Sequence, residues 1–125
     1  MIQTLLFVAL GGALGSALRY LVNITLPRLV GHGFPYATMT VNVLGSFAMG
    51  VLVVVLAMKG GTHFAPFLMT GILGGFTTFS AFSLDAAKLV ETGEIGTAAV
   101  YVLGSVGLGL AALFAGMAFA RGFFA

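Results

Sequence analysis

Four long apolar stretches constrain the fold of this chain more than any other feature of the sequence. They cover about residues 4–22, 36–58, 64–90 and 95–120, and short connections marked by residues such as Pro27 separate them. A helix needs about 20 apolar residues to cross the hydrocarbon core of a bilayer. We therefore predict an all-α membrane protein whose single transmembrane domain, residues 1–125, contains four membrane-spanning helices.

Charged residues are too few to cover a surface exposed to water. They make up 6% of the chain, whereas 60% is hydrophobic, and a soluble domain carries about 25% charged residues. The five basic and three acidic residues are scattered, so nucleic acid finds no basic cluster to bind. The absence of cysteine excludes disulfides and thiolate metal sites. This composition excludes a soluble enzyme and a nucleic-acid binder, and it predicts lipid as the surroundings.

The basic residues are shared almost equally between the two predicted sides of the membrane. Lys59 and Arg121 lie on the side of the termini, Arg28 and Lys88 lie on the other side, and Arg19 lies near the end of the first span. An excess of Lys and Arg on the cytoplasmic side normally sets the orientation. With no such excess the chain could insert in both directions and form an antiparallel dimer. A single charge or the insertion machinery could equally select one orientation.

The third stretch has an unfavourable helix centre. Gly74 and Gly75 are followed by Thr77 and Thr78, and glycine pairs and β-branched residues both weaken a helix. We predict a break over residues 74–78. Backbone carbonyls released inside the membrane need partners. A hard monovalent cation is one solution, and hydrogen bonds from the threonine hydroxyls are the other.

Aromatic and hydroxyl side chains follow the predicted break. Phe79 and Phe82 share nearly one helix face, with Ser80 and Ser83 beside them. The edge of a phenyl ring carries weak positive potential without a fixed charge, so an anion could pass along it and still be released. Packing against another helix or against lipid is the alternative role.

The second and fourth stretches add further hydrogen-bond donors. Thr38 and Asn42 are one turn apart in the second, and Tyr101 and Ser105 are one turn apart in the fourth. An amide in an apolar helix needs a partner, so Asn42 either bonds to a neighbouring helix or faces a hydrated cavity. Donors with almost no carboxylates favour an anion over a cation.

Together these residues resemble the motifs of the Fluc (CrcB) fluoride channel family over essentially the whole chain. The similar segments are Gly11–Tyr20, Thr38–Asn42 and Gly71–Ser83, and the run Gly-Gly-Phe-Thr-Thr-Phe-Ser-Ala-Phe at residues 74–82 is the most specific. The resemblance implies a dual-topology antiparallel homodimer in the bacterial inner membrane. Such a dimer exports fluoride passively through two pores.

The resemblance also implies roles for individual residues. Phe79 and Phe82 would line each pore with their ring edges, and Asn42 would donate its amide to the anion. Arg19 would lie near an aqueous vestibule and raise the local concentration of anions. The other residues of the fluoride pathway would be Ser80, Ser83, Thr38, Tyr101 and Ser105.

The same resemblance implies a structural sodium ion at the dimer centre, held by the backbone carbonyls of Gly74 and Thr77. Two positions depart from the family pattern. Ala37 stands where glycine is usual, and Gly109 stands where the family often has a hydroxyl. At Gly109 the row of polar side chains along the fourth span therefore lacks a hydroxyl that the family pattern would supply.

Other functions need residues that the sequence places elsewhere. A proton-coupled exporter of organic cations needs a carboxylate in the membrane, but Asp85 lies near the end of the third span, and Glu91 and Glu94 lie in a connection. An intramembrane hydrolase needs a Ser/His pair, an Asp pair or metal ligands at depth, whereas His32 and His63 lie in connections. A structural subunit without transport activity is the third alternative. We predict a channel and not an enzyme.

Overall fold

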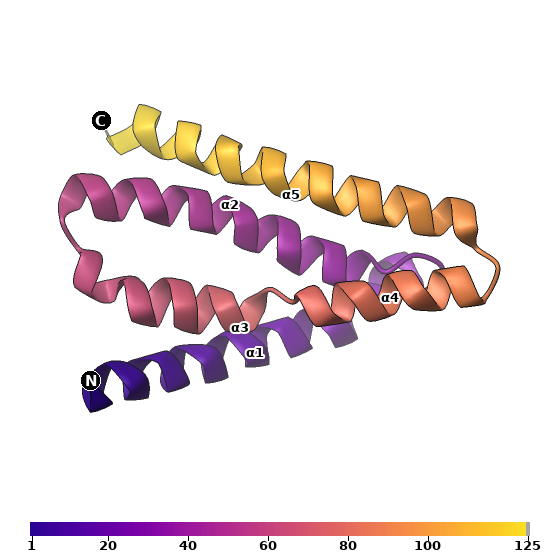
Figure 1. The fold of residues 1–125 in the computed structure, drawn as a ribbon, viewed down its shortest axis with the longest axis horizontal. Coiled ribbons are helices and arrows are strands. Elements are labelled where there is room, and N and C mark those ends of the chain that lie inside the picture. Colours follow the sequence, from indigo (N-terminus) through magenta and orange to yellow (C-terminus); the bar gives the residue numbers. More distant parts are fainter. Residues whose placement is uncertain (125) are drawn as a thin grey trace.

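The computed structural model describes residues 1–124, and these form helices and no strand (Figure 1). Four helical spans are long and apolar enough to cross a membrane, so the chain is an all-α, multi-pass membrane protein, as predicted. Ala125, the last residue of the predicted domain, lies outside the described residues. The elements are α1 (Ile2–Val30), α2 (Tyr36–Lys59), η1 (Thr62–Phe64), η2 (Pro66–Leu73), α3 (Gly74–Phe76), α4 (Phe79–Glu91) and α5 (Ile95–Phe124).

The spans run back and forth across the molecule. Both termini lie at one end, together with the connection between α2 and η1, and the other two connections lie at the opposite end (Figure 1). α2 packs along α5, and α1 packs along η2 and α3. The third span, made of η2, α3 and α4, is interrupted near its middle (Figure 1).

The first span is longer than the sequence predicted. α1 passes through Pro27 and ends at Val30, and the next residue, Gly31, has a positive φ of 91°. Placing Pro27 in a connection was therefore wrong. Proline removes one helical hydrogen bond, but membrane helices tolerate it, and the Gly31 N–H donates to the Pro27 carbonyl at 2.9 Å. At about 1.5 Å per residue the 29-residue helix is about 43 Å long. Arg19 consequently lies well inside α1 and not near its end.

The third span is broken, as predicted, but the break is narrower than predicted. Gly74 and Gly75 are helical, and only Thr77 and Thr78 are extended, with ψ of 157° and 117°. The predicted break near Gly74 to Thr78 is therefore confirmed, and it is confined to the last two of these residues, since Gly74, Gly75 and Phe76 are helical. The threonines, which fit an extended backbone well, form the interruption.

The segment before the break is a π-helix, which the sequence did not predict. It covers Pro66–Leu73, and at its end the Gly74 N–H reaches back five residues to the Met69 carbonyl. Helices of this kind are rare and occur often at functional sites. The first half of the third span thus departs from α-helical geometry over most of its length, and only α3 returns to it before the break.

Glycines bring helix backbones into direct contact at two seams. Where α1 meets the third span, a methyl group on Gly15 would overlap the carbonyl oxygen of Ile72, and one on Gly11 would meet the carbonyl of Phe67. Gly50 of α2 faces the backbone of α5 in the same way. In lipid, such close packing replaces the hydrophobic drive that is missing between helices.

Gly15→Ala should therefore destabilise the protein, because the added carbon overlaps backbone that has little freedom to move. Overpacking of this kind costs about 1–3 kcal/mol. Gly12→Ala is the matched control, since a methyl group there meets nothing within 4 Å. Thermal unfolding in detergent should show a lower midpoint for Gly15→Ala alone, and equal midpoints for the two variants would contradict the seam.

Candidate functional site

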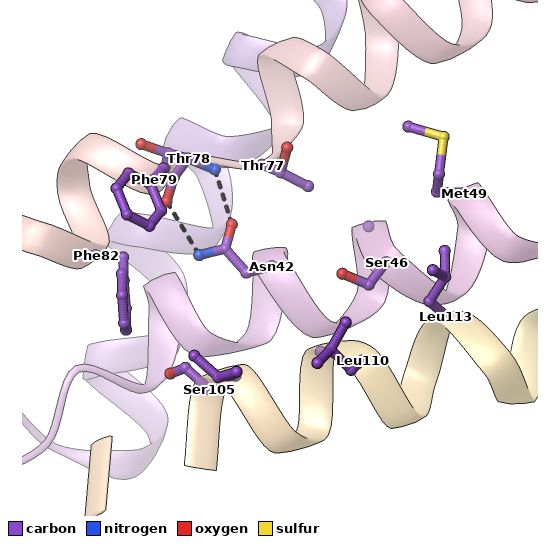
Figure 2. Close-up of a pocket in the computed structure, with 13 residues that line it drawn as sticks. Asn42, Ser46, Met49, Thr77, Thr78, Phe79, Phe82, Ser105, Leu110 and Leu113 are labelled. Atoms are coloured by element: carbon purple, nitrogen blue, oxygen red, sulfur yellow. Dashed lines mark hydrogen bonds between the residues drawn. The ribbon is translucent and has the colours of Figure 1, made fainter. Parts of the chain in front are cut away.

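An open groove lies beside the break and is bounded by α2, α4 and α5 (Figure 2). Its volume is about 450 Å³, and it brings together Asn42, Phe79, Phe82 and Ser105 from the predicted pathway. The groove is also lined by Gly45, Ser46, Met49, Thr77, Thr78, Val106, Gly109, Leu110 and Leu113.

Asn42 makes two hydrogen bonds to the backbone of a single residue at the break. The Thr78 N–H donates to Asn42 Oδ1 at 2.8 Å, and Asn42 Nδ2 donates to the Thr78 carbonyl at 3.0 Å (Figure 2). A backbone N–H can only donate, so it fixes which end of the amide is the oxygen. Asn42 therefore joins two spans, one of its two predicted roles. Its second N–H is not used by Thr78 and is available to a ligand in the groove.

The two threonine hydroxyls also bond to the backbone around the break. Thr77 Oγ1 donates to the Leu73 carbonyl at 2.9 Å. Thr78 Oγ1 accepts the Ala81 N–H at 3.1 Å and so caps the start of α4. The Leu73 carbonyl also accepts the Thr77 N–H at 2.9 Å, so this hydroxyl bonds to a carbonyl that the break has not released, and the hydroxyl alternative predicted for the released carbonyls is not realised there.

Three aromatic rings form a continuous row from the groove into the protein. The ring centroids of Phe79 and Phe82 are 5.7 Å apart, and those of Phe82 and Tyr101 are 5.2 Å apart. Phe34, from the first connection, packs with an interplanar angle of 86° on Tyr101. Phe79 is 78% exposed and Tyr101 is fully buried. The row therefore joins the open side of the groove to the protein interior.

Asp85 lies at the buried end of this row. The Tyr101 hydroxyl donates to Asp85 Oδ2 at 3.2 Å. From the sequence, Asp85 was identified only as an acid near the end of a span, and this contact was not predicted. Its spacing of three residues after Phe82 places it on the same face of α4, and this was the available signal.

Besides Tyr101, three predicted pathway residues do not line the groove. Ser83 donates to the Phe79 carbonyl at 3.1 Å, within its own helix, and Ser80 lies 3.3 Å from Thr78 Oγ1. Both serines are exposed, whereas Thr38 is buried in α2. All three lie on the two elements that carry Phe79 or Asn42, but outside the groove.

Ser105 has a buried hydroxyl without a hydrogen-bond partner among residues 1–124. Buried polar groups are almost always paired. Ser105 lines the groove, so this unused hydroxyl lies beside it. One turn further on, Gly109 offers no hydroxyl, but a methyl group there would lie 3.7 Å from Ser46 Oγ. Ser46, which is not among the predicted pathway residues, therefore supplies a hydroxyl at that end of the groove.

Arg19 contacts the third span just before the break. Its Nε–H donates to the Gly75 carbonyl at 3.0 Å, in a partly buried position. Its predicted place near the end of the first span was wrong, because α1 continues to Val30.

The carbonyls predicted to hold sodium flank the last turn before the break. In the described part of the chain, side chains donate to the carbonyls of Leu73, Gly75 and Thr78, and none donates to those of Gly74 or Thr77. Neutral carbonyl oxygens suit a hard monovalent cation. Within residues 1–124 no group of three or more His, Asp or Glu side chains could hold a metal ion. The carbonyl oxygens present as possible ligands fit sodium better than a transition metal.

Comparison with known proteins places the chain in a family. Residues 6–117, which include every residue of the groove, match the family model described as "CrcB-like protein, Camphor Resistance (CrcB)". The chain belongs to the CrcB family. A relative from Cereibacter sphaeroides, named "Fluoride-specific ion channel FluC", is 66% identical over 100% of both chains. CrcB relatives with the same name from Paracoccus denitrificans and Rhodopseudomonas palustris are 62% and 56% identical, over 98% and 95% of this chain and 98% of each relative.

Proposed function

We propose that this protein is a fluoride-selective channel that exports fluoride passively across the bacterial inner membrane, and is not an enzyme. Relatives that are up to 66% identical over the full length carry the name of such a channel. The observation that carries the proposal is the groove, in which the Asn42 amide and the Ser105 hydroxyl have donors to spare.

The chemistry of the groove suits a small anion that must shed its water. Hydrogen bonds to an anion are stronger than those between neutral groups, so Asn42, Ser105 and Ser46 would replace part of the hydration shell. The ring edges of Phe79 and Phe82 would add weaker positive potential between these donors. None of these groups carries a fixed charge, so the ion is held weakly enough to leave.

The remaining predicted residues flank this route. The Tyr101 hydroxyl donates to Asp85 and is therefore not free to bind an anion. Tyr101 would instead contribute its ring, which packs on Phe82. Thr38, Ser80 and Ser83 would then support the pathway from outside the groove.

Fluoride efflux from liposomes tests this function. Purified protein is reconstituted with potassium fluoride inside, an ionophore dissipates the potassium gradient, and a fluoride electrode follows release. We expect fluoride release far above that of empty vesicles, with chloride retained in the parallel experiment. Release of neither ion would favour a structural subunit. Uptake of an organic cation driven by a pH gradient would favour the exporter.

We further propose that two oppositely inserted copies form the working unit. A single chain leaves Phe79 78% exposed at an open groove. A second copy would close that groove, and with two copies there would be two pathways. The near balance of basic residues on the two sides supports insertion in both directions.

Added lysines should separate the two orientations. Thr62→Lys with His63→Lys adds charge at the end that holds the termini, and His32→Lys with Gly33→Lys adds it at the other end; all four positions are exposed. Each double variant alone should insert in one orientation and lose fluoride flux, whereas coexpression of the two should restore flux. Full activity of either variant alone would contradict the antiparallel unit.

A sodium ion at the carbonyls of Gly74 and Thr77 is proposed as a structural cofactor. It would neutralise backbone dipoles released by the break at membrane depth. Stringent removal of sodium, with N-methylglucamine as the replacement, should reduce fluoride efflux, and added sodium should restore it. Efflux that is independent of sodium would contradict this site.

A further inference from the structure

Arg19 contacts a backbone carbonyl whose helical partner is displaced by the break. In an uninterrupted α-helix the Gly75 carbonyl accepts the N–H of Phe79, four residues on. The extended backbone at Thr77 and Thr78 interrupts that pattern. The Arg19 Nε–H donates to this carbonyl instead, at 3.0 Å.

We propose that Arg19 is a positioning residue whose Nε–H replaces the lost helical hydrogen bond of Gly75 and so fixes where the first half of the third span ends. A carbonyl without a partner is costly at membrane depth. Through the backbone, Arg19 sets the position of the neighbouring Gly74 and Thr77 carbonyls. It also sets the position of Thr78, which holds the Asn42 amide.

The glycine seam explains why Arg19 reaches this carbonyl. Gly15, one turn before Arg19, lies directly against the backbone of the third span at Ile72. Gly75 also lies close to α1, since a methyl group on it would lie 2.6 Å from the Gly12 carbonyl. The two backbones are therefore close enough for the fourth atom of the arginine side chain to meet the carbonyl.

This role differs from that of a charge that attracts anions to a vestibule. Attracting anions requires only a positive charge at residue 19, whereas positioning the third span requires an N–H that reaches the Gly75 carbonyl. Arg19→Gln removes the charge but keeps an amide nitrogen at the position of Nε, the fourth side-chain atom. Arg19→Met has the same length and neither charge nor donor. Arg19→Lys keeps the charge but has a methylene group at that position.

The hydrogen bond can be observed without any transport measurement. The sequence contains three Gly–Phe pairs, at residues 33–34, 75–76 and 122–123. Solid-state NMR of protein labelled with carbonyl-¹³C glycine and ¹⁵N phenylalanine should therefore give one signal for each pair. The Gly75 carbonyl signal should move in Arg19→Met and stay near its original position in Arg19→Gln. The other two signals serve as internal controls. An unmoved Gly75 signal in Arg19→Met would overturn the proposal, whether or not the protein conducts fluoride.

Fluoride efflux gives the second test, which rests on the proposed function. Arg19→Met should lower maximal flux by about tenfold or more, the factor expected for loss of a hydrogen bond from a charged donor. Arg19→Gln should stay within about threefold of the original protein, because a neutral amide makes a weaker bond at the same place. Neither change should alter the fluoride concentration for half-maximal flux.

A vestibule charge predicts the opposite pattern. Arg19→Lys would then be active, and Arg19→Gln would need more fluoride for half-maximal flux and lose its dependence on ionic strength; this result would overturn the proposal. If Arg19→Met fails to fold while Arg19→Gln folds, the donor is again what matters, since both are neutral and equally long. Failure of both variants to fold would show that the charge is required and would count against the proposal.

Discussion

Phe82→Ile should lower fluoride flux by about tenfold or more, the change that about 1.4 kcal/mol in a barrier produces. Phe82 is the central ring of the aromatic row, with Phe79 at 5.7 Å and Tyr101 at 5.2 Å. Isoleucine keeps an apolar side chain there but removes the ring edge that would face the anion. Fluoride-electrode measurements on reconstituted protein give the size of the effect.

The same substitution should have little effect on folding. Loss of the aromatic contacts costs about 0.5–1.5 kcal/mol, so the variant should purify in the same oligomeric state as the original protein. Phe114→Ile is the matched control, because Phe114 is exposed on α5 and does not line the groove. Normal flux in folded Phe82→Ile, or an equal loss in Phe114→Ile, would remove the aromatic row from the pathway.

Asn42→Ala should affect both stability and transport. It leaves the partly buried N–H and carbonyl of Thr78 without their side-chain partner, and the cost of about 1–3 kcal/mol for a fully buried unsatisfied group is the upper bound for each. It also removes the spare amide donor from the groove. We expect a clearly lower unfolding midpoint in detergent and a loss of fluoride flux.

Asn42→Asp separates these two effects. A carboxylate still accepts the Thr78 N–H but cannot donate to the Thr78 carbonyl, and it places a negative charge in the groove. Its stability should lie between those of the original protein and Asn42→Ala, while fluoride flux should be as low as in Asn42→Ala. Flux close to normal in either variant would show that the anion does not use this amide.

The sequence predicts the number of spans well because hydropathy is a strong signal over about 20 residues. α2 and α5 begin at Tyr36 and Ile95, the positions expected from the sequence. α1 was underestimated because a proline reads as a helix end, although Pro27 only removes one hydrogen bond from a helix that continues.

The position of the break was harder to predict because glycine has two uses in a membrane. Gly75 weakens a helix in principle, yet here it is helical and allows α1 to approach closely. The interruption falls on Thr77 and Thr78. Which use a glycine serves depends on the helix packed against it, and periodicity along one span does not reveal that neighbour.

Contacts between spans limited how much of the candidate site could be predicted from the sequence. Asn42, Phe79, Phe82 and Ser105 could be selected by residue type and helical spacing, and all four line one groove. The contact of Arg19 joins residues 56 positions apart, and that of Asn42 joins residues 36 apart. No local pattern encodes such pairs. The chemistry of the groove was therefore more predictable than the hydrogen bonds that hold it in place.

The Thr77 carbonyl and the Thr78 N–H belong to one peptide group, which is rigid and planar. The oxygen is the proposed sodium ligand, and the N–H donates to Asn42 Oδ1 at 2.8 Å. A cation on the oxygen would polarise the whole amide and strengthen the bond to Asn42, and any rotation of the plane would move both contacts at once. Cation occupancy would thereby be coupled, through one rigid peptide group, to the orientation of the amide proposed to bind the anion, without any movement of a helix.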